Sequence, residues 1–282
     1  MARVRRALGT SRIGHTGTLD PLATGILPLV VGRATRLATL LSSADKEYEA
    51  AVRLGLATET YDAAGFTGAV PPPPTGITAD TIEAVLGEFR GSYEQLPPAY
   101  SAKKINGVPA YKLARRNEAV QPAAVSVTVH SLTLVSYTDG LATLRVRSGA
   151  GFYVRSLAHD LGSRLGCGGH LERLRRTRAG AFGESEAVTL QAVEEAGPAA
   201  IHWLLSLSAL LHHLPHVVLN ERGVRRASHG NDVAPDDLAE PSEQAHALEP
   251  AVRWRLLDQA GTLLGIAEPG PAGLLHPVIV LV

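Results

Sequence analysis

Residues 14–25 read Gly14-His15-Thr16-Gly17-Thr18-Leu19-Asp20-Pro21-Leu22-Ala23-Thr24-Gly25, and this run is the most informative part of the chain. Its two leading glycines permit sharp backbone turns, and Pro21 disfavours helical backbone angles at Asp20. These features predict that a loop presents the Asp20 carboxylate. Alternatively, Asp20 is the N-cap of a helix whose first position is Pro21. The two interpretations are compatible, because a capped turn also holds a catalytic side chain in place.

A second informative stretch is Ser148-Gly149-Ala150-Gly151-Phe152-Tyr153-Val154-Arg155-Ser156-Leu157. If its backbone is extended, Tyr153 and Arg155 lie on one face and place an aromatic ring beside a guanidinium. Leucines 157, 161 and 165 then recur at helical spacing up to Gly166, which predicts a helix with an apolar stripe. The pair has either a functional role or a structural one, in which Arg155 at a strand end binds a surface carboxylate.

The rest of the first 210 residues alternates strand and helix patterns. Lys46–Leu56 places every second residue on one apolar face, as a half-buried strand does. Ser126–Tyr137 and Leu141–Ser148 are β-rich, and Thr138-Asp139-Gly140 between them predicts a hairpin. Ala79–Arg90 predicts an amphipathic helix. Because no pattern repeats at a fixed period, we expect a mixed helix-and-sheet domain, not a solenoid or a doubly wound nucleotide fold.

A change of pattern near Pro215 predicts a second, smaller domain. Beyond it lie a short strand at Val217–Leu219 and a helix that Asn220 caps. Three strand-like runs follow, at Val252–Leu257, Leu263–Ala267 and Val278–Val282. This tail, about 70 residues long, predicts a β-barrel module of independent-domain size. The histidines at 212, 213 and 216 could hold a metal, but without a nearby carboxylate pattern we expect a linker there.

Composition restricts the possible classes of protein. With 282 residues, of which 45% are hydrophobic and 19% charged, the chain can bury one substantial core and a second, smaller one. No apolar run approaches the roughly 20 residues that a membrane helix needs, and no apolar segment follows the N-terminal arginines as in a secretory signal. We therefore expect a cytoplasmic protein. The single cysteine, Cys167, excludes an intramolecular disulfide and a multi-cysteine metal site.

The formal net charge is zero, which by itself argues against a nucleic-acid partner. The charges are nevertheless segregated along the chain. Residues 1–41 hold six arginines and one acid, residues 100–116 hold no acid, and residues 164–178 hold five arginines, whereas acidic residues gather between Asp232 and Glu249. This segregation predicts a positive face that follows a phosphate backbone. The alternative is that the charge runs are merely solvated surfaces.

The run at residues 14–25 resembles the signature loop of the TruB-type pseudouridine synthases of bacteria. Four more stretches resemble that family in the same order and spacing: Asp45-Lys46-Glu47-Tyr48-Glu49, Thr58-Glu59-Thr60-Tyr61-Asp62, Pro97-Pro98-Ala99-Tyr100-Ser101-Ala102-Lys103-Lys104 and Phe152-Tyr153-Val154-Arg155. The resemblance implies an α+β fold, with a mixed, mainly antiparallel sheet and flanking helices in a catalytic domain at residues 1–210. The tail is similar, more weakly, to the PUA module of the family, which implies a PUA-like RNA-binding domain at residues 214–282.

The resemblance also implies an activity. The family isomerises uridine to pseudouridine in tRNA, and the implied target is position 55 in the T loop. The uridine is flipped out, the glycosidic bond is cut with the help of Asp20, and a carbon–carbon bond is made to the same ribose. Because no electron is gained or lost, we expect no cofactor and no metal. The implied partner is tRNA, bound at its T arm and, through the tail, at its acceptor end; no membrane and no obligate protein partner is expected.

Individual residues take roles from the same resemblance. Asp20, Tyr48 and Arg155 match the catalytic positions, with Arg155 pairing with the aspartate and Tyr48 stacking on the target base. Five further residues match substrate-binding positions. His15 fills the space that the flipped base leaves, and Tyr153 and Leu174 line the pocket. Lys103 and Lys104 belong to a segment at residues 95–125 that closes over the RNA. Considered alone, Tyr48 and Leu174 are better explained by core packing.

Two other classes of function stay open. An RNA-binding or tRNA-folding protein with impaired catalysis would explain the basic stretches and the tail, but not the joint presence of Asp20, Tyr48 and Arg155. A glycoside hydrolase also cleaves at an anomeric carbon, but it needs two carboxylates flanking the bond. Asp62 is the one obvious second candidate, and its motif suggests a structural role.

Family members begin with a strand and a turn that carry a Lys-Pro-x-Gly signature, followed by a helix. Residues 1–9 of this chain already resemble the later part of that helix. We therefore expect that the N-terminal strand is missing from this sequence and that the natural protein has roughly 25 to 30 more residues, enough for a strand, a turn and half a helix. Its loss would expose sheet backbone and impair catalysis. The upstream DNA, translated in frame, tests this expectation.

Overall fold

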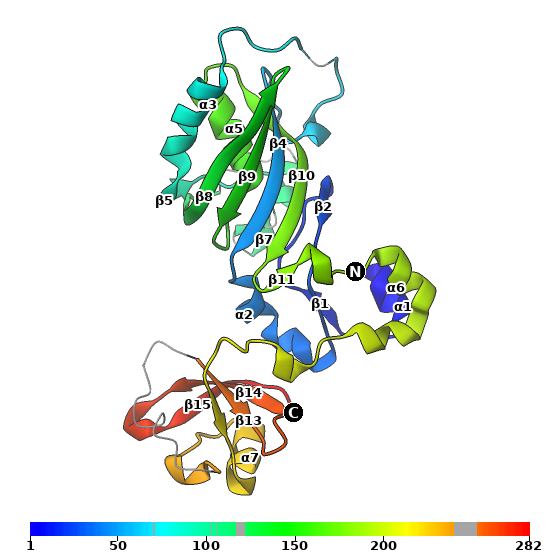
Figure 1. The fold of residues 1–282 in the computed structure, drawn as a ribbon, viewed down its shortest axis with the longest axis vertical. Helices are drawn as coiled ribbons and strands as arrows, with labels where there is room; N and C mark the ends of the chain where they lie inside the picture. Colours follow the sequence, from blue (N-terminus) through cyan, green and yellow to red (C-terminus); the bar gives the residue numbers. More distant parts are fainter. Residues whose placement is uncertain (70, 102, 106, 117–121, 240–252) are drawn as a thin grey trace. The chain divides into compact units, whose positions relative to one another are not determined.

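The computed structural model describes two compact units (Figure 1). Described are residues 1–69, 71–101, 103–105, 107–116, 122–239 and 253–282. The first unit contains Met1–Thr16, Leu29–Leu40 and Val188–Val282, and the second contains Gly17–Pro28 and Leu41–Ala187. Helices accompany mostly antiparallel strands, which confirms the predicted α+β class. The predicted domain limits at residues 210 and 214 stay a prediction.

The second unit is built on one sheet, with strand order β11-β10-β4-β9-β8-β5. The bounds are β11 (Phe182–Gly183), β10 (Gly169–Ala179), β4 (Lys46–Leu54), β9 (Leu141–Ser148), β8 (Val125–Thr138) and β5 (Gly91–Gln95). These neighbours are antiparallel, whereas the short strand β2 (Ala23–Gly25) runs parallel to β10. The sheet is therefore mixed and mainly antiparallel, as predicted.

Local sequence accounts for the central strands. In β4, Ala50, Val52 and Leu54 are buried, as the alternation predicted. The β8–β9 hairpin is confirmed, and its turn has positive φ angles of 50° at Asp139 and 75° at Gly140. Two consecutive positive φ angles are what a two-residue turn needs to match the twist of the strands, and the Asp-Gly pair tolerates them best.

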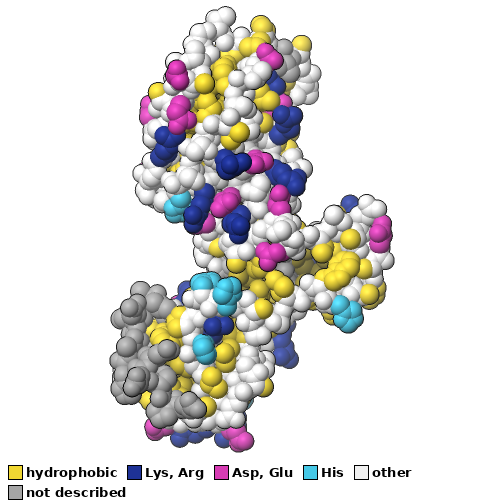
Figure 2. Space-filling view, in the orientation of Figure 1, with side chains coloured by type: hydrophobic (Ala, Val, Ile, Leu, Met, Phe, Trp, Pro, Cys, Tyr) yellow, Lys and Arg dark blue, Asp and Glu magenta, His cyan; other side chains and the backbone are white. Residues whose placement is uncertain are grey.

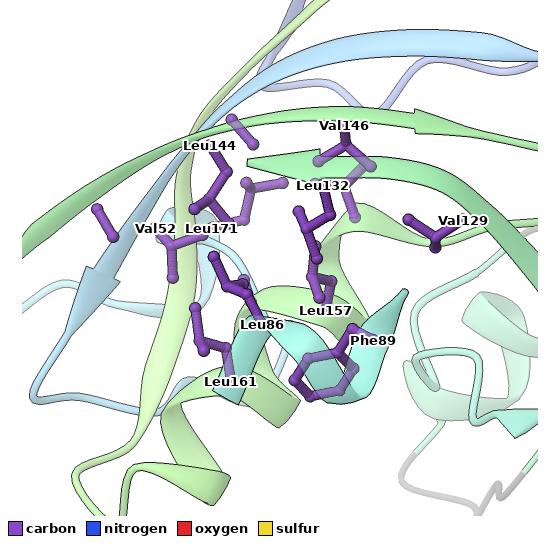
Figure 3. Close-up of a cluster of buried hydrophobic side chains, with 14 of the residues drawn as sticks. Val52, Leu86, Phe89, Val129, Leu132, Leu144, Val146, Leu157, Leu161 and Leu171 are labelled. Atoms are coloured by element: carbon purple, nitrogen blue, oxygen red, sulfur yellow. The ribbon is translucent and has the colours of Figure 1, made fainter. Parts of the chain in front are cut away.

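Two helices, α3 (Ala79–Leu86) and α5 (Val154–Arg164), pack on the sheet and enclose the core (Figures 1 and 3). Thr78 caps α3 by accepting a hydrogen bond from the Thr81 N–H. The helix is shorter than predicted, because after Leu86 the chain tightens into the 3-10 turn η3 (Gly87–Phe89) and inserts Phe89 into the core. Each fully buried large apolar side chain contributes about 1.5–3 kcal/mol.

The prediction of an extended segment through Tyr153 and Arg155 is wrong. Helix α5 begins at Val154, with Tyr153 at its N-cap and Arg155 in its first turn. The apolar spacing that starts the helix already includes Val154, which lies one turn before Leu157 and Ala158, and all three are buried. The predicted stripe through Leu157 and Leu161 is confirmed.

Basic and acidic side chains alternate on the surface of the second unit that faces the viewer in Figure 2. The strand register accounts for one of the pairs, since Glu49 of β4 lies opposite Arg145 of β9. Arg145 pairs with Glu49 at 3.3 Å, Arg147 with Asp45 at 3.0 Å and Arg53 with Glu172 at 2.6 Å. The first two pairs are exposed and contribute about 0–1 kcal/mol each, so they balance charge more than they stabilise the fold, whereas Arg53 and Glu172 are half-buried.

The first unit contains a helical part and a small sheet. The helical part comprises α1 (Ala2–Ala7), α6 (Leu190–Ala196) and the 3-10 helices η1 (Gly32–Leu37) and η5 (Gly197–Trp203), beside the two-stranded sheet of β1 (Ile13–His15) and β3 (Leu29–Val31). The predicted C-terminal sheet is present, with order β12 (His216–Val218), β13 (Trp254–Leu257), β14 (Leu263–Pro269) and β15 (Leu275–Val280). Strand β15 begins three residues before the predicted run, and Pro277 sits beside a register shift, where a missing N–H is tolerated.

A buried carboxylate, Asp237, holds helix α7 (Glu221–Ser228) against its neighbouring loop. Its oxygens accept the Ala234 N–H at 2.9 Å and pair with the Arg222 and Arg226 guanidinium groups. Burial alone would raise the pKa of the Asp237 carboxyl, but the hydrogen bonds from Ala234 and Arg222 and the two arginine charges together lower it. A lowered pKa in the folded state means that Asp237 stabilises the fold above the unfolded pKa of about 3.9 and loses this effect as pH falls through the folded pKa.

We expect Asp237→Asn to destabilise the first unit by roughly 1–3 kcal/mol at pH 7, because the amide cannot satisfy two guanidinium groups. The difference from wild type should shrink as pH falls below 4. Urea unfolding followed by tryptophan fluorescence measures it, since both tryptophans, Trp203 and Trp254, lie in the first unit. Glu221→Gln is the control, because its pair with Arg225 is exposed and 3.9 Å long. Equal midpoints for Asp237→Asn and wild type at pH 7 would show that the carboxylate is dispensable.

Candidate active site

The centre of the candidate site is a two-point ion pair between Asp20 and Arg155. Arg155 donates from Nε to Asp20 Oδ2 at 2.8 Å and from Nη2 to Oδ1 at 2.7 Å. The arginine side chain is 6% exposed, whereas that of Asp20 is 26% exposed. The carboxylate is therefore fixed from the protein side and still accessible to a ligand. Fork-to-fork pairing of this kind gives both strength and a defined orientation.

The loop that carries Asp20 is a turn, not the start of a helix. The Ala23 N–H donates to the Asp20 carbonyl at 2.9 Å, and the chain then enters β2. The alternative of a helix N-cap at Asp20 is thus wrong. The turn ends in a strand because β2 pairs with residues 174–176 of β10.

Arg155 is held on its other side by backbone and by a second carboxylate. Its Nη1 donates to the carbonyls of Thr60, at 3.2 Å, and of Tyr100, at 3.0 Å. Asp62 Oδ2 lies 3.7 Å from its Nε, while Asp62 Oδ1 accepts from the Ala64 N–H and the Thr60 hydroxyl. Asp62 therefore shapes the turn at residues 60–64 and faces the same guanidinium as Asp20. Two carboxylates on one arginine do not form the flanking pair that a glycoside hydrolase needs.

Two tyrosines adjoin the Asp20 carboxylate. Burial raises the pKa of the Tyr48 phenol, and the Asp20 charge adds to this, whereas the charge and hydrogen bond of Arg176 lower it. Burial likewise raises the pKa of Tyr153, with the Ser101 hydroxyl and the Arg155 charge acting in the opposite direction and the Asp20 charge in the same one. Both phenols are therefore protonated at neutral pH. The site thus offers two aromatic rings with neutral O–H groups beside one anion.

Gln95, which sequence reasoning missed, fixes the backbone of Tyr153. Its side chain accepts the Tyr153 N–H at 2.8 Å and donates to the Tyr153 carbonyl at 3.1 Å. Gln95 is 1% exposed, and Ser156 adds a bond to the Leu96 carbonyl at 2.6 Å. A glutamine at the end of β5 carries no sequence pattern that distinguishes it from a surface residue.

Arg176 is the second residue that the sequence did not single out. Its side chain is 1% exposed and donates to the carbonyls of Ile26, at 2.8 Å, and Gly17, at 3.2 Å. Its own carbonyl accepts the Ile26 N–H at 2.9 Å. Gly25 passes so close that a Cβ there would lie 2.1 Å from the Arg176 carbonyl oxygen, at a φ of 91°. Arg176 therefore ties down both flanks of the Asp20 loop and also contacts Tyr48.

The basic stretch at residues 164–178 is thus not a uniform surface. Leu174 and Arg176 face inward on β10, while Arg173, Arg175 and Arg178 are exposed. A period of two along a strand places Leu174 and Arg176 on the same face, so the prediction that Leu174 lines the pocket already implied a buried Arg176.

We expect Arg176→Lys to lower the single-turnover rate by roughly 100-fold with tRNA affinity within a few-fold, because an ammonium cannot reach both loop carbonyls and a small displacement of the reacting group is costly. Arg175→Lys is the matched control, since the adjacent Arg175 is exposed and pairs with Glu184 at 2.8 Å. Unchanged melting of the second unit in circular dichroism separates a positioning effect from unfolding. Equal rates for the two variants would contradict the role.

The other predicted residues lie as follows. Leu174 is buried on β10 opposite Ala23, so it lies beside the Asp20 loop. Lys103 donates to the Ala123 carbonyl at 2.9 Å, and both residues belong to the predicted closing segment. The side chain of Lys104 and residues 117–121 lie outside the described residues. His15 belongs to the first unit, where it ends β1 opposite Leu29.

The described ranges contain no group of three histidine, cysteine or acidic side chains that could hold a metal ion. In the same ranges, no helix combines the length and the apolar character needed to cross a membrane.

Comparison with known proteins gives two family matches. The model described as TruB family pseudouridylate synthase, N-terminal domain, matches residues 5–154, and that described as tRNA pseudouridylate synthase B C-terminal domain matches residues 155–211. Among curated relatives, the tRNA pseudouridine synthase B of Aromatoleum aromaticum is 49% identical over 218 residues, which is 77% of this chain and 70% of that protein. The protein of the same name in Pseudomonas aeruginosa is 42% identical over 283 residues, covering 98% of this chain and 89% of that one.

Solved structures agree on the fold. A crystal structure of a Cbf5-Nop10-Gar1 complex contains a chain that matches with a TM-score of 0.73 at 24% identity, over 100% of this chain and 80% of that one. At this level of identity the similarity concerns the fold alone.

Proposed function

The chain belongs to the TruB family of pseudouridylate synthases, and from this we propose that it isomerises the uridine at position 55 in the T loop of tRNA, with Asp20 as the catalytic carboxylate. It is a tRNA pseudouridine synthase and thus an isomerase; the position and the residues are the proposal. The observation that carries the proposal is the accessible Asp20 carboxylate, held at two points by the buried Arg155.

The reaction makes clear demands on the site. The bond between ribose C1′ and uracil N1 breaks, a bond between C1′ and C5 forms, C5 loses its proton and N1 gains one. An anion beside the sugar can assist cleavage, and Asp20 is the ionisable group with both exposure and a fixed orientation. Arg155 keeps the carboxylate in place while the detached uracil turns. The electron count does not change, so this chemistry requires no redox group.

The residues around the pair suit a flipped base. Tyr48 offers a ring for stacking and a neutral phenol that can pass on a proton, and Tyr153 lines the pocket. Leu174 provides an apolar wall. Flipping a base costs a few kcal/mol, and an aromatic ring that takes its place in the loop offsets part of that cost. We assign this role to His15.

The remaining assignments concern the grip on tRNA. Residues 95–125, with Lys103 and Lys104, close over the T arm in this proposal, and a hydrogen bond from Lys103 to the Ala123 carbonyl connects two parts of this segment. The module at residues 214–282 is PUA-like and touches the acceptor end, and the protein acts in the cytoplasm.

Pseudouridine mapping with a carbodiimide on an unmodified tRNA transcript tests the proposal. We expect one modified site, at position 55, and none when that uridine is replaced by cytidine. Because the product is an isomer of uridine, mass alone would miss it. Tight tRNA binding without any mapped site would favour the RNA-binding alternative. Release of free uracil, or cleavage of free nucleosides and oligosaccharides, would favour a hydrolase.

A further inference from the structure

An arginine surface lies in the first unit, formed by Arg5 on α1, Arg12 just before β1, and Arg33 and Arg36 in η1. All four residues are exposed. The segments that carry them, residues 1–16 and 29–40, contain no acidic residue. Strand β15, whose Val280 carbonyl accepts a bond from Arg36, contains none either.

Contacts within the unit gather these arginines around one end of the β1–β3 pair. Arg5 donates to the Ile13 carbonyl at 3.0 Å, and Arg12 donates to the Thr35 hydroxyl at 3.2 Å. The Gly32 N–H donates to the Arg12 carbonyl at 2.8 Å, which places Arg33 next to Arg12. Three chain segments therefore present their guanidinium groups on the same small scaffold.

The partners of this arginine surface are neutral. Arg5, Arg12 and Arg36 each donate one N–H to a carbonyl or a hydroxyl oxygen. A guanidinium group has five N–H donors, so each of these arginines keeps its positive charge and has several donors left for a ligand. Among the described residues, none of the four is paired with a carboxylate, whereas Arg3 of the same helix is paired with Glu194.

Most exposed arginines on the sheet of the second unit and in the tail are paired with an acidic side chain. On the sheet, Arg145, Arg147 and Arg175 each pair with an acid. In the tail, Arg222, Arg225, Arg226 and Arg253 do so as well. Residues 212–282 hold nine acidic residues against five arginines, so the tail is the more acidic part of the chain.

We propose that the arginine surface binds the tRNA sugar-phosphate backbone and supplies more of the salt-dependent affinity than the tail, which contributes through contacts that depend little on charge. The inference rests on the proposed function only in taking tRNA as the polyanion. Guanidinium groups with free donors pair with phosphate oxygens at two points. Arg12 lies three residues before His15, so a phosphate contact at Arg12 would be close in sequence to the residue assigned to the T loop.

The test is the salt dependence of tRNA binding by the full chain. Each phosphate contact adds about 0.7–0.9 to the slope of log affinity against log salt concentration. We expect Arg12→Gln, Arg33→Gln and Arg36→Gln each to reduce the slope by this amount, equivalent to about sixfold weaker binding at 0.1 M salt. Phosphate contacts carry no sequence information, so an unrelated RNA hairpin should show the same loss.

Matched controls distinguish the loss of a positive charge at the arginine surface from the loss of a positive charge elsewhere on the protein. Arg145→Gln and Arg225→Gln, which lose paired arginines, should leave the slope unchanged, as should Arg33→Lys, which keeps the charge. The single-turnover rate at saturating enzyme should stay within twofold of wild type in every variant. Thermal melting followed by tryptophan fluorescence reports whether the first unit stays folded. If Arg33→Gln unfolds the first unit, the comparison of Arg33→Lys with wild type still tests whether charge at position 33 sets the slope.

Two outcomes would overturn the inference: wild-type slopes in all three glutamine variants, or equal losses in the controls. Pseudouridine mapping at position 55 on the same samples tests the proposed activity separately from tRNA binding by the arginine surface. An unmodified uridine with wild-type enzyme, together with the expected loss of slope, would reject the proposed activity and retain the surface.

Discussion

Asp20→Asn is expected to lower the single-turnover rate of pseudouridine formation by at least roughly 10⁴-fold while tRNA affinity stays within several-fold. The amide preserves the size and shape of the side chain, but it carries no charge with which to attack or assist at the sugar. It also leaves Arg155 with one carboxylate, Asp62, at 3.7 Å. Rates are measured with enzyme in excess over tRNA, so that product release and weak binding do not contribute.

The control for this variant is Asp45→Asn, because Asp45 is an exposed aspartate that pairs with Arg147 on the outer face of the sheet. It should react at the wild-type rate. Mass spectrometry of the Asp20→Asn protein must show that no deamidated enzyme is present. Turnover that persists in a preparation free of aspartate would remove Asp20 from its assigned role.

Arg155→Lys should also lose most of its activity, by roughly 100-fold or more. Arg155 makes four hydrogen bonds at once, two to Asp20 and one each to the Thr60 and Tyr100 carbonyls. A lysine has three donors on one atom and cannot span these acceptors, although it keeps the positive charge. The carboxylate would then lose its fixed orientation.

Arg53→Lys serves as the comparison, since Arg53 also joins a carboxylate, Glu172, and a backbone carbonyl, but outside the site. The single-turnover rate at neutral pH and the tRNA dissociation constant should be measured separately for both variants. Wild-type-like kinetics in Arg155→Lys would show that charge alone suffices and that the two-point geometry is unimportant.

Two features of the fold could be predicted from the sequence because residues close together in the chain determine them. The β8–β9 hairpin follows from an Asp-Gly turn between two β-rich runs, and the apolar stripe of α5 follows from its leucine spacing. The start of α5 was mispredicted because three residues, 153–155, do not distinguish the end of a strand from the first turn of a helix. At Asp20 the predicted loop is confirmed, but the sequence could not reject the alternative of a helix N-cap, because the strand β2 that ends the turn depends on pairing with residues about 150 positions away.

For the site, the family resemblance named the candidate groups and the pairing of Arg155 with Asp20, which the structure contains, but not the residues that hold the neighbouring backbone. Asp20, Tyr48, Tyr153, Arg155 and Leu174 come from different segments, and the structure brings them together in the second unit. Gln95 was missed because a buried polar residue at the end of a strand looks like a surface residue until its partners are known. Arg176 could have been found, because it lies two positions after Leu174 on the inward face of β10. The count of basic residues overestimated the free positive charge of residues 164–178, because most arginines there are paired or buried.

The most direct test of the central claim uses a tRNA transcript labelled with tritium at C5 of its uridines and a single turnover with enzyme in excess. Forming the bond from C1′ to C5 displaces the C5 hydrogen, so each conversion releases tritium to water. We predict release of one tritium per tRNA by the wild-type chain, and none when position 55 is cytidine or when Asp20 is asparagine. Release from the cytidine transcript, or an Asp20→Asn variant as fast as wild type, would contradict the account.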